Sequence, residues 1–155
     1  MQMPRPSDAH QKLTRLVGRW RGEERLYPTP WNPKGGMALA RVENKAALDG
    51  FAVVQDYEQA REGTVHFRGH GVFSWDDPRQ CYTMHWFDSM GMPPSEFKGT
   101  LNDNILTLTS SNPQGQNRAT FNLQQEGKYK FLMEMSPDGH QWYPALEGSY
   151  SREKQ

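Results

Sequence analysis

The chain has 155 residues, 18 basic and 18 acidic side chains, and a single cysteine. Its length predicts one domain over residues 1–155 that buries its core without disulfides, and its zero net charge excludes the basic surface of a nucleic-acid-binding or membrane-surface protein. One cysteine, and an N-terminal stretch without the apolar core of a signal peptide, favour a cytoplasmic protein.

A short helix is predicted over residues 7–17, in the segment SDAHQKLTRLVG. Ser7 is a good N-cap, Leu13 and Leu16 share one face at helical spacing, and Gly18 is a typical C-terminal stop. A helix of this length cannot form a domain by itself. We therefore expect it to plug or flank a larger structure.

The rest of the chain, from residue 19 to residue 151, is expected to be all β. Turn sequences recur at about the 8 to 12 residue spacing of a barrel or sandwich: LDGF, REGT, DDPRQ, LNDN, NPQGQ, EGK and SPDGH. They predict about ten strands, which pair antiparallel as a meander because no crossover helix intervenes. Closure into a lipocalin-like β-barrel removes the exposed edges of such a meander.

The longest irregular segment is YPTPWNPKGG, residues 27–36, whose prolines and glycines predict a loop. Long loops in compact domains are often functional. We expect this one to act as a lid, with Trp20 and Trp31 near the mouth of the barrel.

Three turns together predict which side chains face the barrel interior. The DG turn pairs Asn44 with Gln55. The REG loop then pairs Gln55 with Gly69, and the DDPR loop pairs Gly69 with Trp86. One face of the resulting sheet is apolar and aromatic, and the other is charged, as expected for an interior and a solvated face. A one-residue slip at DDPR would reverse the faces of YTMHWFDSMG.

The predicted inward face contains both space and polar groups. Two mid-strand glycines and two alanines leave room there, whereas a filled small barrel needs bulky branched residues. A mostly apolar cavity with a few convergent polar groups is typical of a small-molecule site. The predicted ligand-binding residues are Asn44, Gln55, Tyr57, Phe67, Gly69, Gly71, Met84, Trp86 and Asp88. A filled core, in which the Asn44 and Gln55 amides bond each other, is the alternative.

The histidines of these strands are predicted to lie on the outward face. His70 and His85 oppose each other in the predicted register, but Cys81 lies too far along the strand to complete a metal site with them. His66 and His70 are separated by about 13 Å on one strand and cannot share an ion. We therefore predict no metal site, and the direction in which His70 and His85 face depends on the register.

Recognisable catalytic motifs are absent from the sequence, which has no phosphate loop, CxxC, HExxH or GxSxG. An enzyme would use Asp88 or His85 as an acid or base, and neither has a recognisable catalytic partner. We therefore favour a binding protein that holds a small apolar or amphipathic ligand, without a cofactor and without nucleic acid or membrane as a partner. A third hypothesis is a dimerising module with a filled interior, and a homodimer is compatible with the binding protein as well.

Segments from most of the chain together resemble the bacterial domain of unknown function 1579 family: GRWRGEERLYPTPW, LDGFAVVQDYEQ, FRGHGVFSWD, YTMHWFDSMG and SPDGHQWYPALEGSYSR. The resemblance implies a lipocalin-like, calycin-type barrel with an internal cavity and no established activity. The opening GRWRGEERLYPT is also similar to the start of nitrobindins, which implies haem binding with nitric oxide or peroxynitrite chemistry as an alternative. Nitrobindins take their axial histidine from a segment near the C-terminus, and LEGSYSREKQ contains none.

Overall fold

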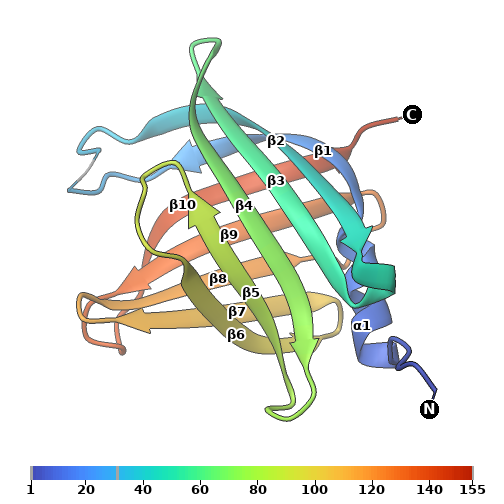
Figure 1. Ribbon diagram of the computed structural model, residues 1–155. Coiled ribbons are helices and arrows are strands. Elements are labelled where there is room, and N and C mark those ends of the chain that lie inside the picture. The colour runs from blue at the N-terminus through green and yellow to red at the C-terminus, as the bar shows by residue number, and fades with distance from the viewer. Residues whose placement is uncertain (1, 31, 155) are drawn as a thin grey trace.

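A computed structural model describes residues 2–30 and 32–154 as a closed barrel of antiparallel strands that follow one another in chain order (Figure 1). The predicted all-β meander is therefore confirmed. The strands are β1 (Gly18–Leu26), β2 (Gly36–Ala47), β3 (Ala52–Arg61), β4 (Thr64–Asp76), β5 (Cys81–Asp88), β6 (Ser95–Asn102), β7 (Ile105–Asn112), β8 (Gly115–Asn122), β9 (Lys128–Ser136) and β10 (Tyr143–Arg152). The first and last strands pair, which leaves the barrel without an open edge.

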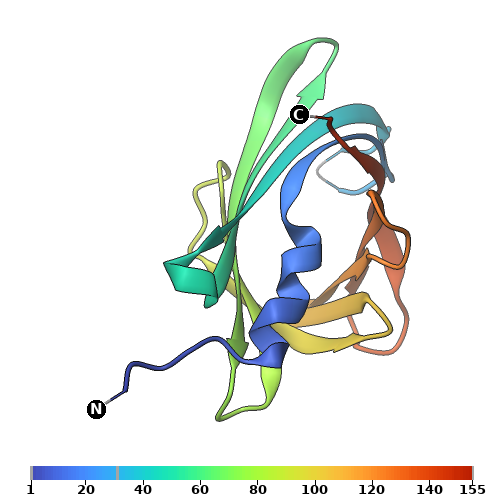
Figure 2. The same ribbon diagram turned by 90° about the vertical axis from the view of Figure 1, so that its right-hand side faces the viewer.

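A short helical segment covers one end of the barrel. It consists of α1 (Asp8–Lys12) and the 3₁₀ turn η1 (Leu13–Leu16), and Figure 2 shows it lying across that end. Ser7 is the N-cap, as predicted, and Gly18 begins β1 with a φ of 144°, which favours glycine. The predicted helix and its role as a plug are confirmed. No helix among the described residues is long and apolar enough to cross a membrane.

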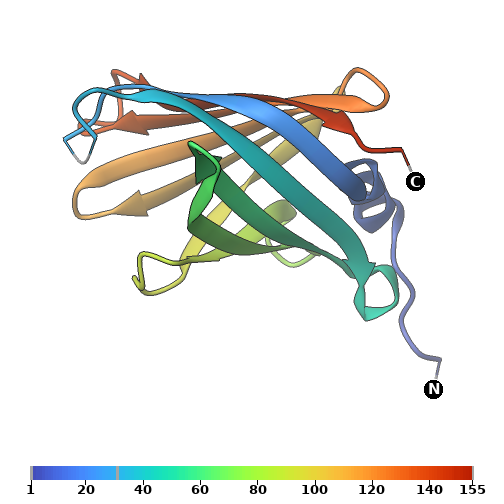
Figure 3. The same cartoon turned by 90° about the horizontal axis from the view of Figure 1, so that it is seen from above.

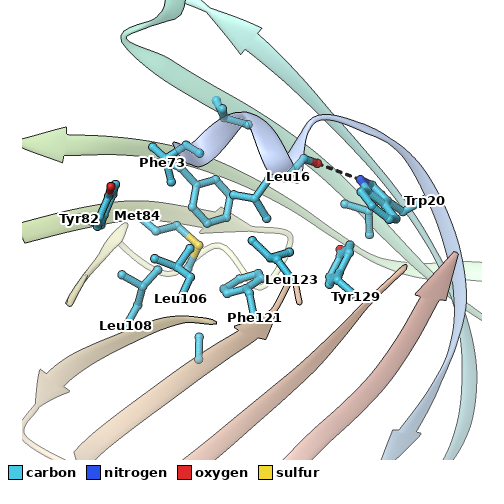
Figure 4. Packing of buried hydrophobic residues seen from close by; sticks show 14 of the residues in the cluster. Leu16, Trp20, Phe73, Tyr82, Met84, Leu106, Leu108, Phe121, Leu123 and Tyr129 are labelled. Atoms are coloured by element: carbon cyan, nitrogen blue, oxygen red, sulfur yellow. Dashed lines mark hydrogen bonds between the residues drawn. The ribbon is translucent and has the colours of Figure 1, made fainter. Parts of the chain in front are cut away.

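The plug is attached to the barrel by apolar contact and by hydrogen bonds. Leu13 and Leu16 are almost completely buried. The carbonyl of Leu16 accepts two hydrogen bonds, from Trp20 Nε1 at 2.9 Å and from Asn44 Nδ2 at 2.8 Å. Figure 4 shows Trp20 at this closed end. The expectation that Trp20 lies near the mouth was therefore wrong, and Trp31 lies outside the described residues.

The hydrophobic core is concentrated beneath the plug (Figure 4). It includes Leu16, Phe73, Tyr82, Met84, Leu106, Leu108, Phe121, Leu123 and Tyr129. Phe73 is fully buried and packs edge-on against Phe121, with ring centroids 5.5 Å apart. The opposite end is bounded by loops, including residues 27–30, 32–35 and 89–94 (Figures 1 and 3).

The predicted strand registers are partly correct. Asn44 opposes Gln55 between β2 and β3, as expected from the DG turn. Between β3 and β4 the register differs by two residues, so that Gln55 opposes Gly71 instead of Gly69. The REG loop is a two-residue turn with positive φ at both positions, which moves the pairing by one residue, and a bulge near Gln59 moves it by another.

The same two-residue difference separates the predicted and observed pairing of β4 with β5, where Gly71 opposes Trp86. A shift of two residues changes the partners of a side chain but leaves it on the same face of the sheet. The predicted inward and outward faces are therefore correct, although most of the predicted pairs across these two hairpins are not.

Both histidines of the predicted pair face outward but do not oppose each other. His70 lies opposite Phe87 and its Nδ1 is 2.8 Å from Oδ1 of Asp56. His85 Nε2 is 3.1 Å from Oε2 of Glu96. The predicted opposition of His70 and His85 was wrong because of the shifted register, and the described residues contain no cluster of three metal-binding side chains.

Candidate functional site

An internal cavity of about 260 Å³ lies between the core and the loop-bounded end of the barrel. Six of the nine predicted ligand-binding residues line it: Gln55, Tyr57, Phe67, Met84, Trp86 and Asp88. The remaining wall was not among the predicted site residues: Val42 lies on β2, whose inward face was predicted, and the other seven residues follow β5, where no registers were predicted. That wall consists of Val42, Phe97, Phe121, Tyr129, Phe131, Met133, Leu146 and Tyr150.

Three of the predicted residues do not line the cavity. Asn44 bonds the plug at the closed end instead. Gly69 and Gly71 do not leave empty space, because the indole of Trp86 lies over them: a Cβ added to Gly69 would lie 2.2 Å from Cη2 and Cζ2 of Trp86. The glycines thus allow Trp86 to lie flat against β4 and form part of the cavity wall.

A buried carboxylate that the sequence analysis missed lies next to the cavity. Glu24 on β1 is fully buried. It accepts hydrogen bonds from Tyr57 Oη at 2.6 and 2.8 Å, from Gln59 Nε2 at 2.7 Å, and from Tyr150 Oη. Two of these donors, Tyr57 and Tyr150, belong to the cavity wall. Its position could have been inferred, since Glu24 lies four residues after Trp20 and shares its inward face.

Small residues allow this network to form. Glu24 opposes Ala38 of β2 on one side and Gly148 of β10 on the other. The buried alanine leaves room for Glu24 to reach across β2 to the tyrosine and glutamine of β3. The glycine leaves room for the Tyr150 ring, because a Cβ added at position 148 would lie 2.2 Å from the Tyr150 hydroxyl oxygen.

The ionisation of three tyrosines is coupled to this buried carboxylate. Burial, and then the negative charge of Glu24, raises the pKa of the hydroxyls of Tyr57, Tyr129 and Tyr150 well above its ordinary value. No ion pair involving Glu24 occurs among residues 2–30 and 32–154. The carboxylate is therefore stabilised by neutral donors alone, which is uncommon for a buried charge.

These raised pKa values predict a loss of stability in alkaline solution. Tyrosine in the unfolded chain ionises near pH 10, whereas Tyr57, Tyr129 and Tyr150 keep their protons in the folded protein. The folded state then binds more protons, so the free energy of unfolding falls above about pH 10, by about 1.4 kcal/mol per pH unit for each tyrosine. Urea unfolding at increasing pH, with phenolate absorbance as a second readout, measures the slope.

The matched variants for this measurement are Tyr129→Phe and Tyr143→Phe. Tyr129 makes no side-chain hydrogen bond with the described residues, so its replacement leaves no donor unpaired. We expect it to make the fall in the free energy of unfolding shallower by the contribution of one tyrosine, about 1.4 kcal/mol per pH unit. Tyr143 is exposed and serves as the control. An equal slope in the wild type and Tyr129→Phe would contradict the predicted coupling.

The amide of Gln55 is another polar group of the cavity wall. Gln55 is only 5% exposed, and its side-chain amide makes no hydrogen bond with the residues that the structure describes. The alternative in which the Gln55 and Asn44 amides bond each other was wrong, because Asn44 donates to Leu16 and its own Oδ1 is unpaired. Among the described residues Asn44 Oδ1 is the fully buried side-chain polar atom without a partner, so the amide of Gln55 stays accessible from the cavity, where it is free to bond a ligand.

The two acid–base candidates from the sequence occupy different places. His85 is on the outer surface, so it cannot act on a molecule inside the barrel. Asp88 lies at the end of β5 and accepts hydrogen bonds from Trp86 Nε1 at 2.9 Å and from the backbone of Met90 at 3.0 Å. These contacts hold Asp88 at the start of the DSMG turn. The described cavity wall includes no histidine, so it offers no axial ligand of the nitrobindin kind.

Comparisons with known proteins agree with this fold. A family model described as "Protein of unknown function (DUF1579)" matches residues 5–152. No curated protein matches the chain. The crystal structure of Rv2717c from M. tuberculosis is 13% identical, with a TM-score of 0.72 over 96% of this chain and 99% of that one. The S-type phycobiliprotein lyase CPES from Guillardia theta is 11% identical, with a TM-score of 0.63 over 96% of this chain and 94% of that one. At these identities the likeness concerns the fold alone.

Proposed function

The chain belongs to the DUF1579 family, whose description assigns no function, and we therefore propose from the cavity itself that the protein binds a small, largely apolar ligand inside the barrel. The observation that carries this proposal is the amide of Gln55, which has no hydrogen-bond partner among the described residues, in a cavity wall that is aromatic and aliphatic apart from this amide and the carboxylate of Asp88. Ligand sites combine a mostly apolar lining with a few polar groups that orient the ligand.

The volume of the cavity limits the size of the ligand that it can hold. Its volume of about 260 Å³ is slightly below the usual range of about 300–1,000 Å³ for small-molecule pockets. A compact aromatic molecule or a medium-length aliphatic chain suits such a space. The wall is also adaptable, because the thioethers of Met84 and Met133 belong to it and methionine side chains adjust to irregular shapes.

The arrangement of the barrel supports a binding role more than a purely structural one. The hydrophobic core is concentrated beneath the plug, whereas the cavity lies toward the loop-bounded end. A dimerising module with a filled interior has no need for this space. One structural neighbour is named a phycobiliprotein lyase, which is compatible with a barrel that handles another molecule but indicates no particular ligand here.

Uptake of the neutral, polarity-sensitive dye N-phenyl-1-naphthylamine tests the proposal. We expect its fluorescence to rise on binding to the wild type, and to rise much less with Met133→Trp, which fills the cavity. The control is Leu132→Trp, because Leu132 is the next residue of β9 and faces the opposite side of the sheet. Equal fluorescence with both variants would show that the dye binds elsewhere, and no fluorescence with any of the three proteins would contradict the proposal.

A further inference from the structure

Two carboxylates lie at the cavity, one in its wall and one directly behind the wall. Its wall contains no lysine, arginine or histidine among the described residues, and Asp88 is its one carboxylate. Glu24 lies directly behind the wall, in hydrogen-bond contact with Tyr57 and Tyr150. A further negative charge, brought by a ligand into this mostly apolar cavity, would be repelled by both carboxylates and would find no cation in the described wall to neutralise it.

Two of the three tyrosines of the wall, Tyr57 and Tyr150, are also oriented by Glu24. The hydroxyl of Tyr57 donates its single proton to the carboxylate and accepts a hydrogen bond from Gln59 Nε2 at 3.0 Å. The hydroxyl of Tyr150 likewise donates its proton to Glu24. Since a phenol has one proton and two lone pairs, these hydroxyls can offer a ligand only acceptor positions.

We propose that the cavity selects ligands whose polar end donates hydrogen bonds and carries no negative charge, such as an alcohol or an amine, and that it excludes carboxylates. This inference rests on the proposed function and specifies its ligand class. The carboxylate of Glu24 acts as a positioning group, because it sets the direction of the Tyr57 and Tyr150 hydroxyls without belonging to the cavity wall itself. Asp88 adds its negative charge at the end of β5.

Displacement of N-phenyl-1-naphthylamine by four probes that share a ten-carbon chain, at neutral pH, tests this selectivity. Decan-1-ol and decylamine have donor groups, methyl decanoate has neither a donor nor a charge, and decanoate has a negative charge. We expect the alcohol and the amine to bind at least about tenfold more tightly than decanoate, a difference of about 1.4 kcal/mol. The affinity of methyl decanoate should lie between that of decan-1-ol and that of decanoate, because the ester lacks a donor but carries no negative charge.

Two variants assign the selectivity to the buried carboxylate. Glu24→Gln removes the negative charge and keeps an acceptor, so we expect its preference for decan-1-ol over decanoate to fall severalfold. Glu23→Gln makes the same change of charge at the exposed, outward-facing neighbour, and its preference should equal that of the wild type. Asp88→Asn provides a second test at a half-buried position of the cavity wall, with a smaller fall in the same direction.

The failure of this inference differs from the failure of the proposed function. If the dye and decan-1-ol bind but decanoate binds within about threefold of the alcohol, the selectivity is wrong and the binding function stands. An equal affinity of methyl decanoate and decan-1-ol would contradict the need for a donor. If neither the dye nor any of the probes binds, the proposed function itself is wrong.

Discussion

Replacing Glu24 with leucine is expected to lower the free energy of unfolding by about 4 kcal/mol, because three buried donors lose their acceptor together. These donors are the hydroxyls of Tyr57 and Tyr150 and the amide of Gln59. Each buried donor left without a partner costs about 1–3 kcal/mol, and the removal of a buried charge offsets part of the sum. Urea unfolding at neutral pH, followed by tryptophan fluorescence, measures the change.

The control for this experiment is Glu23→Leu. Glu23 is exposed on the same strand, and substitutions at such surface positions usually change stability by about 0.5 kcal/mol or less. The double variant Tyr57→Phe/Tyr150→Phe in the Glu24→Leu background removes two of the orphaned hydroxyls and should recover part of the loss. Equal stability of Glu24→Leu and the wild type would mean that the network does not stabilise the barrel.

Replacing Phe73 with alanine is expected to lower the free energy of unfolding by a similar amount, about 4 kcal/mol, for a different reason. Phe73 is fully buried beneath the plug and packs against Phe121, so truncation leaves a cavity in the hydrophobic core. The same measurement as for Glu24→Leu applies. The matched control is Phe87→Ala, because Phe87 is 47% exposed on the outward face of the neighbouring strand and loses much less contact.

The Phe73→Ala variant also tests whether stability and dye binding depend on different ends of the barrel. The closed end contains the plug and the core, so we expect Phe73→Ala to lower stability while the folded variant still binds the dye. A loss of dye binding in fully folded Phe73→Ala would show that the packing of the closed end controls the cavity. A loss of stability as small as that of Phe87→Ala would contradict the assignment of the core to the closed end.

Much of the fold could be predicted from the sequence, because it depends on local signals. The helix cap at Ser7, the stop at Gly18 and the spacing of the turns predicted a plugged antiparallel barrel. The faces of β2 to β5 were also correct, since a strand alternates its side chains with a period of two residues. Two register errors between β3 and β5 left these faces unchanged because each was a shift of an even number of residues.

The amino-acid sequence by itself therefore determined the architecture and which side chains of these strands face inward. Only the tertiary structure decided which inward side chains meet. Glu24 reaches Tyr57 across β2 and Tyr150 on β10, Trp86 fills the space above Gly69, and Asn44 bonds the plug instead of a ligand. The physical reason is that periodicity places a side chain on a face, whereas its neighbours depend on register, bulges and barrel closure between strands far apart in the chain.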